Sequence, residues 1–263
     1  MEGIVKGIGG IFFVAGDPES LNKWYEKRLG IGGIFPWEDA ADKKTKGYTA
    51  WNTFSKASPL FRDYSKDFVF NYRVDHLAPL LERLKNNGIN TADTVTEDGN
   101  GKHAFMDDLE GNRIILWEPS AFVPASKNFV GERVTGLGGL FFKSQDVPKL
   151  KAWYADNLGF DVTQWGCTFR WIDPKDPGAK VPARTEWSPF KADTDYYLPS
   201  KKQFMMNYRV KDLVTLLGNL KQEGVEVVGQ MEEFSYGKFG WIMDPEQNKI
   251  ELWEPRDEGF DTV

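Results

Sequence analysis

Cysteine is almost absent from this chain of 263 residues, with Cys167 as its single example. One cysteine excludes an internal disulfide and any zinc site built on a Cys-x-x-Cys pair. The sequence also has no apolar run close to the roughly 20 residues that a membrane-spanning helix requires. Its first residues, MEGIVKGIGG, lack the pattern of a signal peptide. We therefore expect a cytoplasmic protein that does not enter a membrane.

Clusters of positive charge are also missing. The 33 lysines and arginines are outnumbered by 39 aspartates and glutamates, the net charge is −6, and no block of basic residues occurs. Nucleic acids and anionic membranes attract proteins through clustered positive charge. The composition therefore argues against both as partners. We expect a small-molecule ligand instead, bound by a monomer or a homodimer.

Aromatic side chains, in contrast, are plentiful. Ten Trp, nine Tyr and nineteen Phe make up 14% of the chain. Two interpretations are open, because such rings can fill a hydrophobic core or line a cavity that binds a flat ligand. The strand or helix position of each ring is needed to distinguish core packing from a ligand cavity.

The chain contains an internal repeat. Three pairs of segments carry it: 7–17 and 136–146, 70–74 and 206–210, and 116–119 and 252–255. The first pair is offset by 129 residues and the last by 136, so the second copy carries about seven inserted residues. A repeat of this size predicts two similar modules, at 1–119 and 135–263, joined by a linker at 120–134. We expect a ligand site between the modules.

Each copy has the same order of expected elements. Asp17 suits the N-cap of a helix, Pro18 its first position and Gly30 its end, and the second copy repeats this pattern from Asp146 to Gly159. The other expected segments are strands at 9–15, 47–54, 67–74, 103–107 and 113–118, a helix at 75–87, and counterparts at 184–190, 203–210, 211–223, 238–243 and 249–254. The predicted order in each copy is therefore β-α-β-β-α-β-β.

Four segments carry a resemblance to a known family: Trp24–Gly30, Trp153–Phe160, Asn207–Val210 and Asp244–Pro255. They resemble the vicinal oxygen chelate (VOC) superfamily, which includes glyoxalase I, bleomycin-resistance proteins and extradiol dioxygenases. The last segment is similar to the signature Asp-Pro-x-Gly-Asn-x-Ile-Glu-Leu, with Gln247 in place of glycine. The resemblance implies an α+β fold of two tandem glyoxalase-like modules. Each chain half would hold two βαβββ-type units that pair into a cupped mixed sheet, with helices outside and the ligand inside.

Strand alternation assigns side chains to the two faces of such a cup. We predict that Ile11 and Phe13 face the helices. The residues expected to bind the ligand are Phe12, Trp51, Asn71, Arg73, Trp117, Phe141, Lys143, Trp187, Asn207, Arg209 and Trp253. Another interpretation is open for each of them. The tryptophans are also compatible with core packing, and the asparagines and arginines with hydrogen bonds between strands.

The resemblance also implies positions for metal ligands. Carried over residue by residue, they are Gly10, Gly139, Val69, Met205, Ile115 and Glu251. Only Glu251 has a side chain that can bind a divalent cation, and a site normally needs three protein ligands or more. We therefore predict no metal and no cofactor. A divalent metal held through His76 or His103 stays open as an alternative.

Glu251 is the candidate catalytic residue. A lone carboxylate in an apolar cup can have a raised pKa and act as a general acid or base, or it can pair with Arg209, Arg73 or Lys143. Two hypotheses follow. In the first, the protein binds an aromatic or oxygen-rich small molecule in a cup between the modules, as bleomycin-resistance proteins do, without the family's metal. In the alternative, it is a VOC-type lyase, isomerase or dioxygenase that uses Glu251 or an unrecognised divalent metal site.

Overall fold

The computed structural model of the chain describes residues 3–42, 44–92, 94–120 and 133–256. The first half contains β1 (Val5–Val14), α1 (Pro18–Leu29), β2 (Ile34–Asp39), β3 (Lys46–Phe54), β4 (Phe68–Val74), α2 (Leu77–Asn86), β5 (Thr96–Asp98), β6 (Gly101–Asp107) and β7 (Arg113–Pro119). The second half contains β8 (Val134–Ser144), α3 (Val147–Leu158), β9 (Cys167–Ile172), β10 (Ala183–Lys191), β11 (Phe204–Val210), α4 (Leu213–Gln222), β12 (Val227–Phe234), β13 (Gly237–Met243) and β14 (Lys249–Pro255). Most of the predicted linker at 120–134 lies outside the described residues, and the module boundaries stay predictions.

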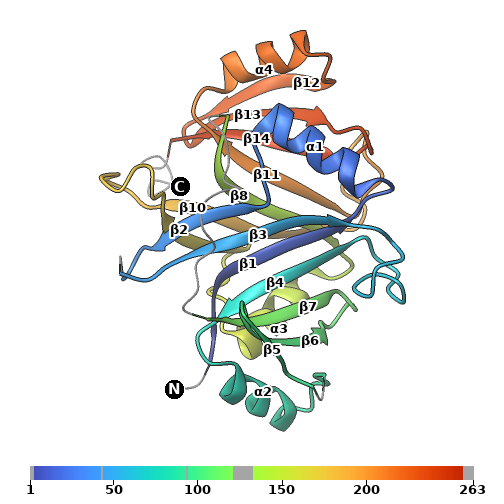
Figure 1. The fold of residues 1–263 in the computed structure, drawn as a ribbon, viewed down its shortest axis with the longest axis vertical. Coiled ribbons are helices and arrows are strands. Elements are labelled where there is room, and N and C mark those ends of the chain that lie inside the picture. The colour runs from blue at the N-terminus through green and yellow to red at the C-terminus, as the bar shows by residue number, and fades with distance from the viewer. Residues whose placement is uncertain (1–2, 43, 93, 121–132, 257–263) are drawn as a thin grey trace.

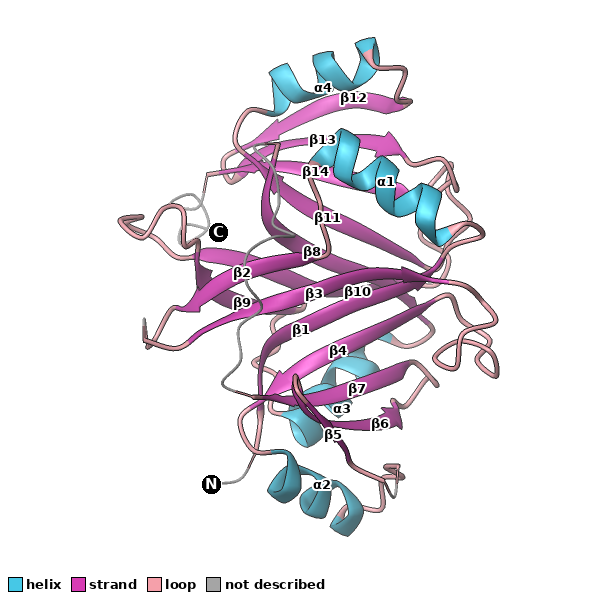
Figure 2. Ribbon diagram, viewed as in Figure 1, coloured by secondary structure: helices cyan, strands magenta, loops and turns pink. Residues whose placement is uncertain are grey.

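All the described strands belong to one curled sheet with helices on its outside (Figures 1 and 2). The strand order is β12-β13-β14-β11-β8-β10-β9-β2-β3-β1-β4-β7-β6-β5. Each half contributes two units, which meet where β1 pairs antiparallel with β4 and where β8 pairs antiparallel with β11. The predicted α+β fold, with paired units in each chain half and helices outside, is confirmed.

The first helix of each half begins and ends as predicted. The Asp17 carboxylate accepts a hydrogen bond from Ser20 N at 3.1 Å, and Gly30 ends α1 in the left-handed conformation at φ 74°. In α3, Asp146 accepts from Lys149 N at 3.1 Å and Gly159 also has φ 74°. A residue with a Cβ is strained at such an angle, so glycine is the residue that ends these helices best.

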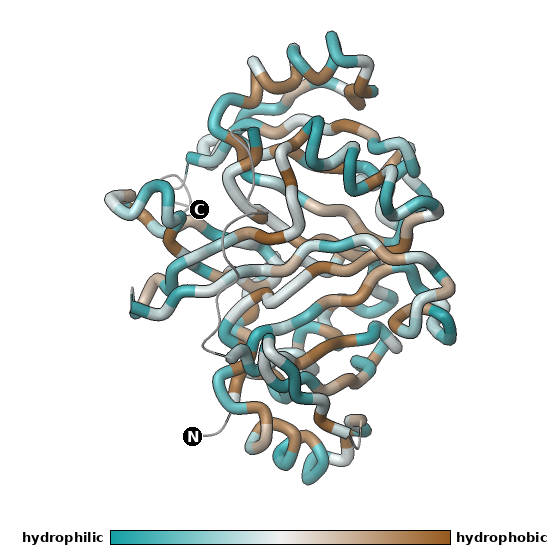
Figure 3. The backbone as a smooth tube through the Cα atoms, in the orientation of Figure 1, coloured by the Kyte–Doolittle hydropathy of each residue, from teal (hydrophilic) through white to brown (hydrophobic). Residues whose placement is uncertain are grey.

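The two halves share one hydrophobic core. The first helix of each half, α1 or α3, is hydrogen-bonded to the other half. In Figure 1, α1 lies beside β13 and β14 of the second half. Strand alternation places Ile11 and Phe13 in this core, as predicted, together with Trp51 and Trp187. The second helix, α2, buries Leu77, Leu80, Leu81 and Leu84, and Figure 3 shows its turns alternating between hydrophobic and hydrophilic residues. None of the helices in the described ranges combines the length and apolar character that crossing a bilayer requires.

Four strands were not expected from the sequence, namely β2, β5, β9 and β12. Strand β2 contains Pro36, which lacks a backbone donor and weakens any strand prediction. Strand β12 is largely exposed and polar, so it lacks the alternation that marks a half-buried strand. The missed pair β2 and β9 is important, because Glu38 pairs with Ile172 and Asp39 with Trp171 at the junction of the two halves.

Candidate functional site

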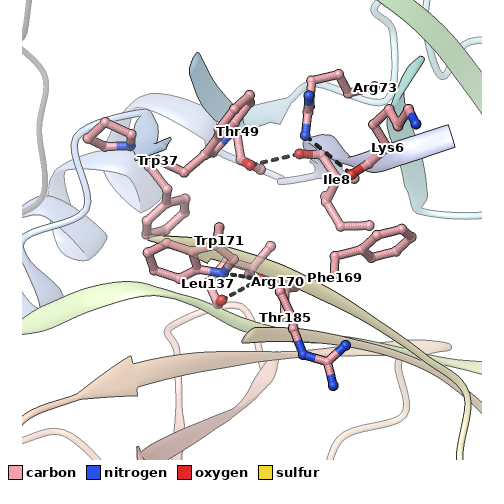
Figure 4. Close-up of a pocket in the computed structure, with 13 residues that line it drawn as sticks. Lys6, Ile8, Trp37, Thr49, Arg73, Leu137, Phe169, Arg170, Trp171 and Thr185 are labelled. Atoms are coloured by element: carbon pink, nitrogen blue, oxygen red, sulfur yellow. Dashed lines mark hydrogen bonds between the residues drawn. The ribbon is translucent and has the colours of Figure 1, made fainter. Parts of the chain in front are cut away.

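The space between the halves is nearly closed. Figure 4 shows one wall with Ile8, Trp37, Thr49 and Arg73 from the first half, facing second-half residues that include Trp171. The cavity between them is about 30 Å³, enough for about two water molecules. The space between the halves therefore holds a small cavity lined by tryptophan and arginine side chains, and a ligand cup between the modules stays a prediction.

Arg73 and Arg209 belong to this junction. The Arg73 guanidinium carbon lies 4.0 Å from the ring centroid of Trp37, and its Nη2 donates to Lys6 O at 3.2 Å. Burial lowers the pKa of Arg73 to about 10, against the influence of the Asp39 carboxylate. Arg209 lies 5.0 Å from the ring centroid of Trp253. These contacts support the interpretation in which both arginines hold strands and tryptophans together.

A much larger hollow lies inside the first half. It has a volume of about 840 Å³ and opens over the inner face of β1, β3, β4, β6 and β7. We call it the first cup and define it by residues that line it: Phe12, Phe54, Ser58, Leu60, Asn71, Thr91, His103, Phe105, Arg113 and Ile115. Two predicted ligand residues, Phe12 and Asn71, lie here, and so does His103.

Several polar atoms on the wall of the first cup have no partner among the described residues. Buried Ser58 Oγ and Thr91 Oγ1 make no hydrogen bond, and both residues line the cup. Asn71 also lines it, but its unpartnered Oδ1 is turned to Gly9, as that of Asn207 is turned to Gly138 in the other half. Asn71 itself is only 5% exposed. Buried polar groups in native proteins are nearly always hydrogen-bonded, because an unpaired one costs about 1–3 kcal/mol. The first cup therefore has the character of a binding site.

The corresponding hollow of the second half is filled by the protein's own side chains. We call it the second cup; it consists of Phe141, Phe190, Tyr196, Tyr197, Met205 and Trp241. The Tyr196 ring stacks on Phe190, with centroids 5.4 Å apart and planes 3° from parallel, and meets Trp241 edge-on. Lys143 lies at the border of this cluster, with its Nζ 5.6 Å from the ring centroid of Tyr197.

Glu251 lies at the bottom of the second cup and is 2% exposed. Its carboxylate accepts hydrogen bonds from Tyr196 OH, from Asn207 Nδ2 at 2.5 Å and from Trp241 Nε1 at 2.8 Å. Burial raises the pKa of Glu251, and these three donors oppose that shift. Both carboxylate oxygens thus accept hydrogen bonds from side chains of the second half.

The four predicted tryptophans lie in two different places. Trp51 and Trp187 are core residues that bind across the halves: Trp51 Nε1 donates to Tyr208 OH at 2.7 Å, and Trp187 Nε1 donates to Tyr72 OH at 2.8 Å. Trp117 and Trp253 lie at the ends of the last strands. Trp117 stacks on His103 and Trp253 on Phe239, each pair within 7° of parallel.

The sequence reasoning missed most of the first cup. Phe105 was detectable, because it alternates with His103 along the predicted strand at 103–107. Phe54, Ser58, Leu60 and Thr91 lie in or beside loops, where no periodic pattern marks the direction of a side chain. The predicted ligand residues are thus divided among the first cup, the second cup, the junction and the core.

Comparison with known proteins gives a fold. No family model matches the sequence, and no curated protein matches it. Among solved structures, a catechol 2,3-dioxygenase is 17% identical, with 96% of this chain and 90% of that chain covered and a TM-score of 0.60. The Mn(II)-bound glyoxalase from Novosphingobium aromaticivorans is 12% identical, with 96% and 83% covered and a TM-score of 0.59. A variant of 4-hydroxymandelate synthase from Streptomyces coelicolor is 10% identical, with 97% and 94% covered and a TM-score of 0.62.

These similarities define the class of fold. The chain has the two-module fold of the vicinal oxygen chelate proteins over nearly its whole length, as the resemblance in the sequence implied. The same likeness connects it to glyoxalases and dioxygenases as structural relatives. At these identities the likeness establishes the fold and leaves the chemistry to the residues of this chain.

The comparison also corrects the prediction of no cofactor. A glyoxalase with this fold is Mn(II)-bound, so the fold gives no reason to expect the absence of a metal. The side chains at the six carried-over ligand positions do not fit such an ion, because only Glu251 can ligate and its carboxylate is already hydrogen-bonded. Within the described ranges, no group of three or more His, Cys, Asp or Glu residues is placed to hold a metal. We therefore derive no chemical step through a metal.

Proposed function

We propose that the protein binds a small organic molecule in the first cup. The observation that carries this proposal is the open hollow itself, whose wall includes two buried hydroxyls without a partner, Ser58 Oγ and Thr91 Oγ1. Small-molecule sites are typically hollows of about 300–1,000 Å³ with apolar walls and a few convergent polar groups. The first cup, at about 840 Å³, has this size and composition.

The apolar part of the wall also supports a ligand. Phe12, Phe54, Leu60 and Ile115 line the cup, and so does Phe105, which is 38% exposed. Leaving large apolar side chains open to water has a free-energy cost of about 25 cal/mol per Å². A ligand that covers these rings therefore gains binding energy without any change in the fold.

Proteins of similar structure suggest which molecules to test first. Their names specify catechol, 2,2',3-trihydroxybiphenyl and, in one complex, 3,4-dihydroxyphenylacetate. All are aromatic rings that carry oxygen. We therefore propose an aromatic or oxygen-rich ligand for this chain as well. A catalytic role of Glu251 has less support, because the second cup is filled and the Glu251 carboxylate accepts three hydrogen bonds there.

The test is a titration of the protein with catechol and a panel of small oxygenated compounds, followed by methyl NMR. Binding in the first cup should shift the Ile115 signal with a saturable dose dependence. Ile115→Trp should abolish binding, measured by titration calorimetry, because the larger ring occupies the cup. The matched control is Val214→Trp on α4, where the side chain is 55% exposed and the same enlargement is harmless. Unchanged binding by Ile115→Trp, or no shift with any compound, refutes the proposal.

A further inference from the structure

The filled second cup indicates the ligand chemistry of the open first cup. We propose that the first cup takes a molecule with an aromatic ring and an oxygen acceptor. The ring lies where the Tyr196 ring lies in the second cup, and the oxygen accepts a hydrogen bond from Asn71. This inference rests on the proposed function and adds the class of ligand to it.

The strand register establishes which residues of the two cups correspond. Asn71 pairs with Ile115 between β4 and β7, as Asn207 pairs with Glu251 between β11 and β14. On the neighbouring strands, Phe105 pairs with Ile115 and Trp241 pairs with Glu251. Ile115 therefore holds the place of Glu251, and Phe105 the place of Trp241.

The loop that carries Tyr196 also has a counterpart. The segment from Phe54 to Phe68 has the same length as the segment from Phe190 to Phe204, so Leu60 corresponds to Tyr196. Both loops lie over their own cup, because Leu60 packs in the cluster of the first cup and Tyr196 in that of the second. The exchange of a tyrosine for a leucine removes a ring from the first cup.

The open space in the first cup corresponds to the position of the Tyr196 ring in the second cup. In the second cup, the Tyr196 ring contacts Phe190 and Trp241, and its hydroxyl binds Glu251. The counterparts of these contacts are Phe54, Phe105 and Ile115, and each of them lines the first cup. An aromatic ring placed there would stack on Phe54 and meet Phe105, in geometries that favour aromatic pairs by about 0.5–1.5 kcal/mol each.

Asn71 supplies the polar part of the argument. Its Oδ1 packs against Gly9, where an added Cβ would lie 2.6 Å away, as Asn207 Oδ1 packs against Gly138. The two amides are therefore turned alike. In the second cup, Nδ2 of Asn207 donates to Glu251. In the first cup, Ile115 offers no acceptor, so Asn71 Nδ2 is left to donate to an oxygen of the ligand.

The probe that tests this inference is 4-methylphenol, which is the free side chain of tyrosine. Its comparison compound is 4-methylcyclohexanol, which has the same substituents on a ring that is not flat. The phenol should bind the first cup at least tenfold more tightly, and Asn71→Leu should weaken its binding about tenfold because one buried hydrogen bond is lost. Equal binding of the two compounds in the first cup overturns the aromatic class and leaves the proposed function standing. If neither binds there, although another compound does, the inference also fails.

A reciprocal pair of variants tests the correspondence itself. Leu60→Tyr should abolish the binding of 4-methylphenol by filling the first cup from within, whereas Leu60→Met, which adds no ring, should keep it. Tyr196→Leu should open the second cup, and 4-methylphenol should then raise the melting temperature of this variant more than that of the wild type. Undiminished binding by Leu60→Tyr, or no added stabilisation of Tyr196→Leu, overturns the inference.

Discussion

The phenol of Tyr25, on the first helix of the first half, donates a hydrogen bond of 3.0 Å to Oδ2 of Asp244 in the last turn of the second half. Its counterpart is the bond of 2.9 Å from Tyr154 to Asp108, which runs in the opposite direction between the halves. Both tyrosines are fully buried, and burial raises their pKa values well above the ordinary range. The two bonds attach each first helix to the sheet of the other half.

Removal of one of these hydroxyls should destabilise the whole chain. Tyr25→Phe leaves the buried Asp244 carboxylate short of a donor, although Asn248 still binds it. We expect a loss of about 1–3 kcal/mol in the free energy of unfolding, measured by urea denaturation. The matched control is Tyr48→Phe, whose hydroxyl lies 3.5 Å from Asn100 Oδ1 and should matter little. Equal losses in the two variants would contradict the assigned importance of the bond.

Trp187 should prove to be a structural residue. Trp187→Phe removes part of a ring with no solvent exposure and its hydrogen bond to Tyr72. We expect a loss of about 2–3 kcal/mol in unfolding free energy. The affinity for a ligand of the first cup should stay unchanged, because Trp187 packs in the shared core. A lower affinity at unchanged stability would instead support the alternative in which this tryptophan binds the ligand.

The stability of the second cup should depend on pH through Glu251. Burial raises its pKa in the folded state above the 4.5 of an unperturbed glutamate, so the folded protein binds this proton more tightly than the unfolded chain does. The ionised carboxylate therefore costs stability above its folded pKa, and this cost disappears as the pH falls below 4.5. Wild type should gain stability relative to Glu251→Gln as the pH is lowered from 7, in urea denaturation at a series of pH values.

The control for this pH experiment is Met205→Leu, which alters the packing of the same cup without an ionisable group. Its stability should follow the wild-type pH dependence. If the difference between wild type and Glu251→Gln were constant over the whole range, the carboxyl would not titrate as its environment indicates.

Glu223 should show the opposite dependence. Its carboxylate binds Arg28 at 2.9 Å and Arg133, and hydrogen bonding to Arg133 is the main reason why its pKa falls to about 2. A lowered pKa contributes stability above the unfolded value of 4.5, and this contribution is lost as the pH falls towards 2. Glu223→Gln should be less stable than wild type at pH 7, by about 1 kcal/mol or less because the pair is partly exposed. The difference should shrink on acidification.

A double-mutant cycle with Arg28→Met isolates the pair that joins α1 to the second half. At pH 7 the two substitutions should be less than additive in unfolding free energy. Strict additivity would mean that the observed contact between Arg28 and Glu223 contributes nothing to stability.

Local patterns were sufficient to predict the helices, most of the strands and the faces of β1. The alternation of Ile11, Phe12 and Phe13 separates core from cup correctly, and Asp17 and Gly30 delimit α1. These features depend on neighbours along the chain. The contacts of Trp51 depend instead on Tyr208, 157 residues away, and no periodicity within one strand predicts a partner from the other half.

The candidate site was harder to predict from the sequence, because its side chains come from loops that are distant along the chain. The sequence predicted Glu251 on the inner face of its sheet, and its catalytic role stays a prediction. What occupies that face is Tyr196, which a loop brings to it from 55 residues away. The openness of the first cup depends in the same way on Leu60 in the corresponding loop. The prediction of no cofactor was based mainly on the side chains at the ligand positions, and the Mn(II)-bound glyoxalase contradicts it.

The crossing of α1 and α3 has a consequence for the origin and assembly of the molecule. Each half completes the helix layer of the other, so the single chain has the architecture of a two-fold symmetric dimer in which the partners have exchanged an arm. An isolated half would present Tyr25 without Asp244, or Tyr154 without Asp108, and would be complete only when it met a second half. Because the two halves are one chain, their association is an intramolecular step. The two copies can also differ in sequence, so that Tyr196 fills the second cup while the first cup stays open.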